Sequence, residues 1–301
     1  LPLGPLSPHP PRDSHGGARD VPERQAAAAE AQGVRRRTWL LSGVGVGGAL
    51  LLGWGALPPR SRLGNAGTLP AAPNEIGLNG WIRIAEDGSV RLAMNRSEMG
   101  QGVHTALAML VADELDVRLE RVQLIEAGAD SLYGNVAAFA ASLPFHPSDT
   151  EPGAETRIVR TSRWIVAKLV RELGINMTGG SSTVADAWDV LRLAAATARA
   201  QLLGAASLQW RVPVGGLRVA GGGIRHPPGP AAHYGTLAKI ASATPPGRVK
   251  LKAPKDWRLI GRPAPRIDVP PKIDGSAIYG SAGRPPGQPY APAGPCPVAG
   301  G

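Results

Sequence analysis

The chain has 301 residues, 43% of them hydrophobic, which is enough for one large domain or two smaller ones with a core. Its formal net charge is +10, but acidic residues are interspersed with the basic ones, and no stripe of Lys and Arg alternates with aromatics. Nucleic acid is therefore not an expected partner. Cys296 is the only cysteine, which excludes an intrachain disulfide and a thiolate cluster, and no Cys and His spacing suits zinc or an iron–sulfur centre.

The N-terminal part of the chain is predicted to lie outside the fold. Residues 1–34 have no hydrophobic period and are expected to be disordered. Residues 35–57 start with Arg35-Arg36-Arg37-Thr38-Trp39 and continue as a Gly-rich apolar run, which resembles a twin-arginine export signal. An uncleaved membrane anchor and a buried Gly-rich helix are the alternatives. The expected location is periplasmic or inner-membrane-anchored, and residues 58–78 are expected to be a linker.

Residues 79–262 are predicted to form an α+β domain, a twisted mixed sheet with packed helices. The elements expected first are a hairpin of Trp81–Ile84 and Val90–Met94, a helix over Val103–Leu115 and a strand over Val122–Glu126. After an irregular segment from residue 130 to 160, we expect helices over Ser162–Leu173 and from Thr183 to Leu202, strands over Trp210–Val212 and Leu217–Val219, and a helix over Gly235–Ala241.

The first candidate site is the turn Met99-Gly100-Gln101-Gly102, between the strand ending at Met94 and the helix beginning at Val103. Two glycines allow close approach of the backbone to a bound group, and the Gln101 amide offers donors and an acceptor. The alternative is that these glycines serve only the geometry of the turn. His104 is expected at the surface or as a capping residue, and Asp113 and Glu114 are expected on a solvated helix face.

The second candidate site is Thr178-Gly179-Gly180-Ser181-Ser182, at the start of the next helix. Free N–H groups, a glycine pair and several hydroxyls are suited to an anion. Thr183 and Asp186 have the spacing of a capping box, and an ordinary N-cap after a glycine turn is the alternative interpretation.

The order of these motifs, followed by Pro254-Lys255-Asp256 and Arg266-Ile267-Asp268, resembles the molybdopterin-binding large subunit of the xanthine dehydrogenase/aldehyde oxidase family, with the isoquinoline 1-oxidoreductase beta type as the most similar branch. The resemblance implies a molybdenum hydroxylase that inserts water-derived oxygen into an aldehyde or N-heterocycle. It implies a molybdenum-molybdopterin cofactor, in the cytosine dinucleotide form, and a separate small [2Fe-2S] subunit. The implied cofactor contacts are Met99, Gly100, Gln101, Gly102, Thr178, Gly179, Gly180, Ser181 and Ser182.

The chain also departs from this family pattern. The family's large subunit is more than twice as long, and its glutamate base lies near the far C-terminal end, so no catalytic or metal-binding residue is expected here. Residues 263–301 are expected to begin a truncated β-rich, hammerhead-like domain with a flexible end. We therefore expect an N-terminal fragment that gives no turnover alone. The second hypothesis is a membrane-anchored scaffold or decayed remnant whose glycine turns are purely structural.

Overall fold

The computed structural model of the chain describes residues 44–45, 47–50, 53–55, 57, 60–151, 153–280, 283 and 286–287. The chain divides into two compact units, Leu1–Pro58 and Pro59–Gly301. The predicted tail at 1–34 and the paired arginines lie outside the described residues. The described residues between 44 and 55 are helical. Over the described part of the chain, no helix combines the length and the apolar character needed to cross a bilayer.

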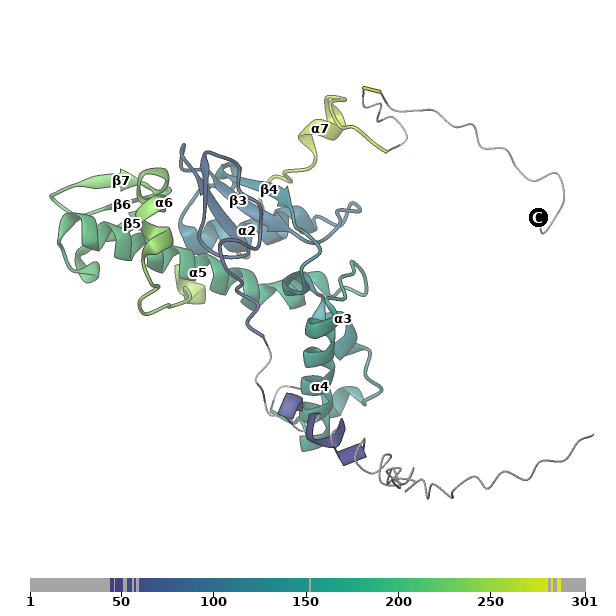
Figure 1. The fold of residues 1–301 in the computed structure, drawn as a ribbon. Coiled ribbons are helices and arrows are strands. Elements are labelled where there is room, and N and C mark those ends of the chain that lie inside the picture. Colours follow the sequence, from purple (N-terminus) through teal and green to yellow (C-terminus); the bar gives the residue numbers. More distant parts are fainter. Residues whose placement is uncertain are drawn as a thin grey trace, which may run out of the picture. The chain divides into compact units, whose positions relative to one another are not determined.

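The second unit is built on a four-stranded sheet with the order β1-β2-β3-β4 (Figure 1). β1 (Glu75–Gly77), β2 (Ile82–Ala85) and β3 (Val90–Met94) are antiparallel neighbours, whereas β4 (Val122–Glu126) runs parallel to β3 over the whole of both strands. The predicted hairpin, the predicted strand at 122–126 and the mixed α+β sheet are therefore confirmed.

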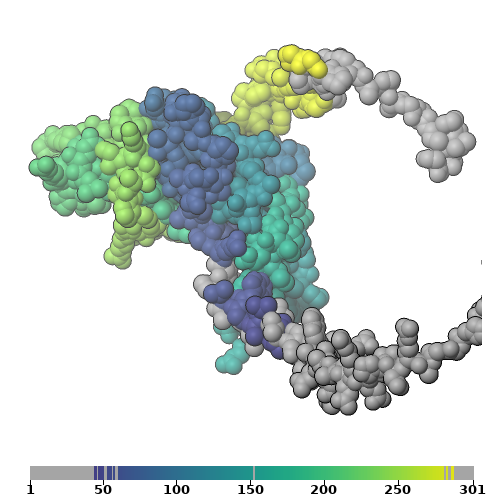
Figure 2. Space-filling model, viewed as in Figure 1, coloured from purple at the N-terminus to yellow at the C-terminus, as the bar shows by residue number. Residues whose placement is uncertain are grey.

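Three helices form the core with this sheet. α2 (Val103–Leu115) connects β3 to β4 and packs on α5 (Thr183–Trp210), and α6 (Tyr234–Ala243) packs on both α5 and β2. In Figure 2 the light-green atoms of the α6 region lie beside the blue atoms of the β1–β3 strands. The largest fully buried apolar side chains are Trp81, Tyr133, Tyr234, Ile82, Ile84, Leu92, Leu107, Leu115, Leu191, Leu202 and Ile224.

A second, smaller sheet follows α5. It contains β5 (Arg218–Ala220), β6 (Gly223–Arg225) and β7 (Ala231–His233), all antiparallel. The strand predicted at Leu217–Val219 is therefore confirmed, and so is the helix predicted at Gly235–Ala241. The strand predicted at Trp210–Val212 is wrong. Trp210 is the last residue of α5, because the Ala-rich sequence before it keeps a helical apolar period.

The segment from 130 to 160, expected to be irregular, contains three short helices before α4. They are η2 (Ser131–Tyr133), α3 (Val136–Ala141) and η3 (Pro147–Asp149). α4 (Arg157–Leu173) begins earlier than predicted, because the Thr156 hydroxyl caps it by accepting from the Val159 N–H at 3.3 Å. Its predicted apolar side is open to solvent within the described residues, with Trp164 38% and Leu173 68% exposed.

The remaining short elements are η1 (Leu119–Arg121), η4 (Val214–Gly216), η5 (Pro254–Asp256) and α7 (Pro270–Ile273). The described residues from 263 to 280, where a β-rich domain was expected to begin, contain α7 and no strand.

Within the linker expected at 58–78, the described residues 60–78 pack against the domain instead. Its last residues form β1, and Leu69 and Leu78 are buried. The Arg62 carbonyl accepts a hydrogen bond from Trp81 Nε1 at 2.6 Å. A composition rich in Gly and Pro suggested a free segment, but these side chains supply part of the core.

Asp113 and Glu114 are not on a solvated face, as was expected; both carboxylates are completely buried. Glu114 pairs with Arg192 and Arg199 at 2.9 and 3.2 Å. The Asp113 carboxylate accepts from three successive backbone N–H groups, those of residues 258–260. These contacts fasten residues 250–268, here named the C-terminal strap, along α2.

We predict that Glu114→Gln destabilises the fold by about 3 kcal/mol or more, because one buried and one half-buried guanidinium group lose their counter-charge. Urea unfolding of the full chain measures the change. Glu120→Gln is the matched control, since Glu120 is exposed, and should change the free energy of unfolding by less than about 0.5 kcal/mol. Equal losses in the two variants would contradict the prediction.

Candidate functional site

The first candidate turn lies where β3 leads into α2. Gly100 and Gly102 have φ values of 101° and 80°, in the left-handed region that L side chains avoid, and Gly102 is the N-cap residue of α2. The backbone conformation of the turn therefore requires glycine at these two positions. The turn stands at the carboxyl end of β3, the end at which parallel strands joined by a helix bind ligands.

Glu98, to which sequence reasoning assigned no role, caps the start of α2. Its carboxylate accepts from the backbone N–H groups of Gly100, Gly102 and His104 at 2.9, 2.8 and 3.1 Å. Partial burial would raise the pKa of Glu98, but these three bonds together outweigh it and hold the pKa below its usual range. The N–H groups at this helix start are therefore already taken by a group of the chain itself.

Gln101 is exposed, and its amide folds back on the turn. Its Nε2 donates to the Ser97 carbonyl at 2.9 Å, and its Oε1 accepts from the Met99 N–H. Met99 is 67% exposed. His104 was expected at the surface or as a capping residue. It is half-buried, and its Nε2 contacts the Arg96 carbonyl oxygen at 2.9 Å. Gln101 thus shapes the turn in this state, with the open side of the turn facing solvent.

The second candidate turn lies directly beside the first. The Thr178 hydroxyl accepts from the Ser97 N–H at 3.0 Å, and Asn176 Nδ2 donates to the Asn95 carbonyl at 2.9 Å. Ser97 and Thr178 are 81 residues apart in sequence, yet these bonds join the two motifs. The structure therefore brings both predicted sets of residues into one site.

The start of α5 differs from that of α2 because no side chain caps it. Its N-cap residue is Ser182, whose hydroxyl donates instead to the Gly179 carbonyl at 2.7 Å and accepts from Asn135 Nδ2 at 2.8 Å. Gly180 and Ser181 before it have φ values of 59° and 53°. The N–H groups of the first turn of this 28-residue helix remain available to an acceptor.

The predicted capping box of Thr183 and Asp186 is wrong. The Asp186 carboxylate turns away from the helix start and accepts from Arg62 Nη2 at 2.7 Å and from Arg96 Nη2 at 2.8 Å. It also accepts from the Val136 N–H at 2.8 Å. Two arginines compete for this carboxylate more strongly than a backbone N–H does, because charge-assisted hydrogen bonds are the stronger kind.

A cavity of about 470 Å³ opens beside the two turns. It lies at the carboxyl ends of β3 and β4, and its lining includes Arg96, Ser97, His104, Glu126 and Asn176. Arg96 is 4% exposed, and its Nε is buried without a hydrogen-bond partner. An unpartnered buried guanidinium N–H is costly and indicates a site suited to an acceptor-rich ligand.

The C-terminal strap completes the first turn. Arg266 Nη1 donates to the Gly100 carbonyl at 2.7 Å, and its guanidinium lies 3.4 Å from the Glu98 carboxylate. Asp268 pairs with Arg266 and with Lys272 at 2.6 Å each. These contacts hold the pKa of Asp268 well below its usual range, first through Arg266 and then through Lys272. A row of alternating charges therefore links the strap to the start of α2.

Sequence reasoning did not assign Arg96, Glu98, Asn135 or Arg266 to the site. The sequence gave a weak indication for Arg96 and Glu98, because they lie between a strand and a helix, where ligand-binding residues are often found. Asn135 and Arg266 reach the turns from other segments. No local pattern marks Asn135, and the Arg266-Ile267-Asp268 motif gave no sign that Arg266 contacts the first turn. Within the described ranges, no group of three His, Cys, Asp or Glu side chains is placed to hold a metal ion.

The chain is similar to known molybdopterin-binding proteins. Residues 18–143 match the family model described as molybdopterin cofactor-binding domain. The beta chain of isoquinoline 1-oxidoreductase from Brevundimonas diminuta is 31% identical over 280 residues, covering 78% of this chain and 32% of that protein. This chain is a relative of the molybdopterin-binding large subunits of the xanthine dehydrogenase family.

Two other proteins are similar to this chain. A nicotinate dehydrogenase subunit of Pseudomonas putida is 29% identical over 255 residues, covering 82% of this chain and 17% of that protein. Membrane-bound aldehyde dehydrogenase [pyrroloquinoline-quinone] of Gluconacetobacter polyoxogenes is 30% identical over 219 residues, covering 66% of this chain and 22% of that protein. The chain spans 32% or less of the length of these three relatives.

We predict that Glu98→Ala lowers the free energy of unfolding by about 1 kcal/mol at pH 7, the usual effect of losing a helix cap. The pKa of Glu98 is lower in the folded than in the unfolded chain, so its stabilisation is present above the unfolded pKa of about 4.3. It is lost as the pH falls through the folded pKa. Urea unfolding at several pH values should show the two proteins converging in acid; a constant difference would contradict this role.

Replacing Arg266 tests the link between the strap and the turn. In Arg266→Ala, we predict severalfold faster amide hydrogen exchange at Gly100, Gly102 and His104, because the Gly100 carbonyl and the Glu98 carboxylate both lose their contact with the Arg266 guanidinium. Mass spectrometry of peptides covering the turn measures the rate. Arg262→Ala, on the same strap but exposed and away from Glu98, should leave the rate unchanged.

Proposed function

We propose that this chain forms the cofactor-holding part of a molybdenum hydroxylase large subunit, an oxidoreductase that hydroxylates an aldehyde or N-heterocycle with oxygen from water. The observation that carries the proposal is the pairing of the two glycine turns through Ser97 and Thr178, beside a cavity of about 470 Å³. The relationship to molybdopterin-binding subunits supplies the class of ligand.

The residues present fit an acceptor-rich group such as a pterin with a phosphate. Arg96 Nε is a buried donor without an acceptor, and the first turn of α5 has no side-chain cap. Because Glu98 already occupies the donors of α2, we propose that the anionic end of the cofactor lies nearer to Thr178, Gly179, Gly180, Ser181 and Ser182.

At the other turn, Met99, Gly100, Gln101 and Gly102 would approach the pterin through the exposed backbone and the Gln101 amide. Turning outward, that amide would exchange its bonds within the turn for bonds to a pterin edge, which carries both donors and acceptors. Arg266 would hold the Gly100 carbonyl in place meanwhile.

When bound, the molybdenum cofactor supplies the redox chemistry of hydroxylation. The residues of this chain would bind and orient it. We assign no catalytic base among them. Because the matched part of this chain covers only 32% and 17% of two relatives, we expect no turnover from this polypeptide alone.

The proposal extends to partners and location. Two of the relatives are named as single subunits of their enzymes, which supports assembly with another protein chain. We propose a small [2Fe-2S] protein in that role, because the single cysteine of this chain holds no cluster. We also propose the cytosine dinucleotide form of the cofactor and periplasmic export or anchoring through the twin-arginine-like sequence at 35–57, a route that carries folded, cofactor-loaded proteins.

Bound pterin is the direct test. The full chain, expressed with a molybdenum-cofactor supply, should co-purify with a pterin that is released by denaturation and measured by fluorescence after oxidation. We predict that Gln101→Ala lowers the pterin content at least about tenfold, the effect of losing about 1.4 kcal/mol of hydrogen bonding. The matched control is Gln209→Ala, at the exposed end of α5, which should keep the content of the parent chain.

Circular dichroism must show that each protein is folded. Folded parent chain without any pterin would overturn the proposed function and favour the scaffold hypothesis. A folded Gln101→Ala variant with full pterin content would contradict only the role proposed for Gln101, and not the proposed function.

A further inference from the structure

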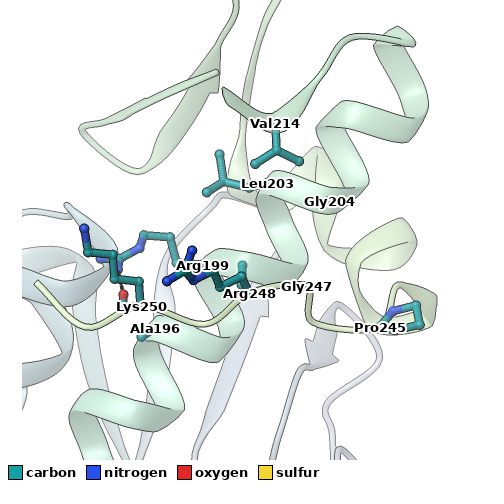
Figure 3. Close-up of a pocket in the computed structure, with 10 residues that line it drawn as sticks. Ala196, Arg199, Leu203, Gly204, Val214, Pro245, Gly247, Arg248 and Lys250 are labelled. Carbon is teal, nitrogen blue, oxygen red and sulfur yellow. Dashed lines mark hydrogen bonds between the residues drawn. The ribbon is translucent and has the colours of Figure 1, made fainter. Parts of the chain in front are cut away.

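A second cavity lies away from the glycine turns, between α5 and residues 245–250 (Figure 3). Its volume is about 410 Å³, within the range of small-molecule sites. The part of α5 that lines it begins at Ala196, roughly 20 Å along the helix from its start beside the second glycine turn. The cavity is therefore separate from the proposed cofactor site.

Small side chains on α5 leave this space open. Ala196, Ala200 and Gly204 recur every four residues and so share one face of the helix. Arg199 fixes the opposite wall, because its Nη2 donates to the Lys250 carbonyl at 2.6 Å. At the far end, a Cβ on Gly204 would lie only 2.8 Å from Thr244 Cγ2, so the following segment passes directly against the helix.

The cavity has one apolar and one basic end. Figure 3 shows Leu203 and Val214 together at one end, and Arg199, Arg248 and Lys250 grouped at the other. Arg199 and Leu203 are about one helical turn apart, so the two ends are separated by roughly 6 Å along the axis.

At the basic end of the cavity, two positive charges have no acidic partner among the described residues. None of the ten residues that line the cavity is acidic. Arg199 is paired with Glu114, whereas Arg248 and Lys250 enter none of the ion pairs formed within the described segments. They are alternate residues, with half-buried Val249 between them, and both line the cavity. Both side chains are exposed, so either can contact an anion that enters the cavity.

We propose that this cavity binds a small organic carboxylate, with its anionic group between Arg248 and Lys250 and an apolar ring against Leu203 and Val214. The separation of the two ends suits a short methylene spacer between carboxylate and ring. The proposal does not rest on the proposed function, since it uses no residue of the glycine turns.

The probe is 4-phenylbutyrate, titrated into the full chain and followed by calorimetry, with neutral 4-phenylbutyramide and inorganic phosphate titrated in parallel. We expect saturable binding of the carboxylate, with the amide and phosphate each at least about tenfold weaker, because each lacks one of the two matched ends. Equal binding of the amide would overturn the basic half of the proposal, and equal binding of phosphate would overturn the apolar half.

Two variants locate the site. Arg248→Gln with Lys250→Gln should weaken binding at least about tenfold, whereas the matched double variant Arg225→Gln with Arg262→Gln removes two exposed charges elsewhere and should leave it unchanged. Ala200→Leu should abolish binding by filling the cavity. An equal loss in both double variants would overturn the proposal, as would full binding in folded Ala200→Leu. If Ala200→Leu does not fold, the comparison of the two double variants tests whether the ligand binds in this cavity.

Discussion

The buried Asp186 carboxylate is the constraint on which the site depends. Its side chain is 2% exposed, and a carboxylate so enclosed is tolerated only when charged and polar donors surround it. Arg62, Arg96 and the backbone N–H of Val136 supply those donors from positions 124, 90 and 50 residues away. Satisfying one charge therefore fixes the first turn of α5 relative to the end of β3, and with it the spacing of the two glycine turns.

The two helix starts at the site are not equivalent. α2 is completed by a carboxylate of the chain itself, that of Glu98, whereas α5 begins without any side-chain cap. A helix start with unused N–H groups carries a partial positive charge. At a helix start capped by a carboxylate, this charge is largely neutralised. At the start of α2, the side chains therefore hold Gly100 and Gly102 in position. The donors left for a ligand lie between Ser182 and Arg96.

The sequence predicted what depends on neighbours in the chain. The hairpin, the glycine turn, α2 and β4 follow from local periodicity and from the φ values that Gly100 and Gly102 must adopt. Local patterns failed where the deciding partner is distant. Glu114 was expected in solvent, but its arginine partners lie 78 and 85 residues further on. Asp186 had the spacing of a capping box, and only the fold brings the arginines that it prefers.

The C-terminal strap sets the order in which the site is assembled. Arg266 reaches the Gly100 carbonyl across 166 residues, so the two ends of this contact leave the ribosome far apart in time. At roughly 5 to 20 residues per second the interval is about 10 to 30 s. During that interval the nascent chain can pair β3 with β4, but the glycine turn before α2 still lacks its contact with Arg266. The finished geometry of the turn is therefore a product of late folding, reached only after nearly the whole described domain has been made.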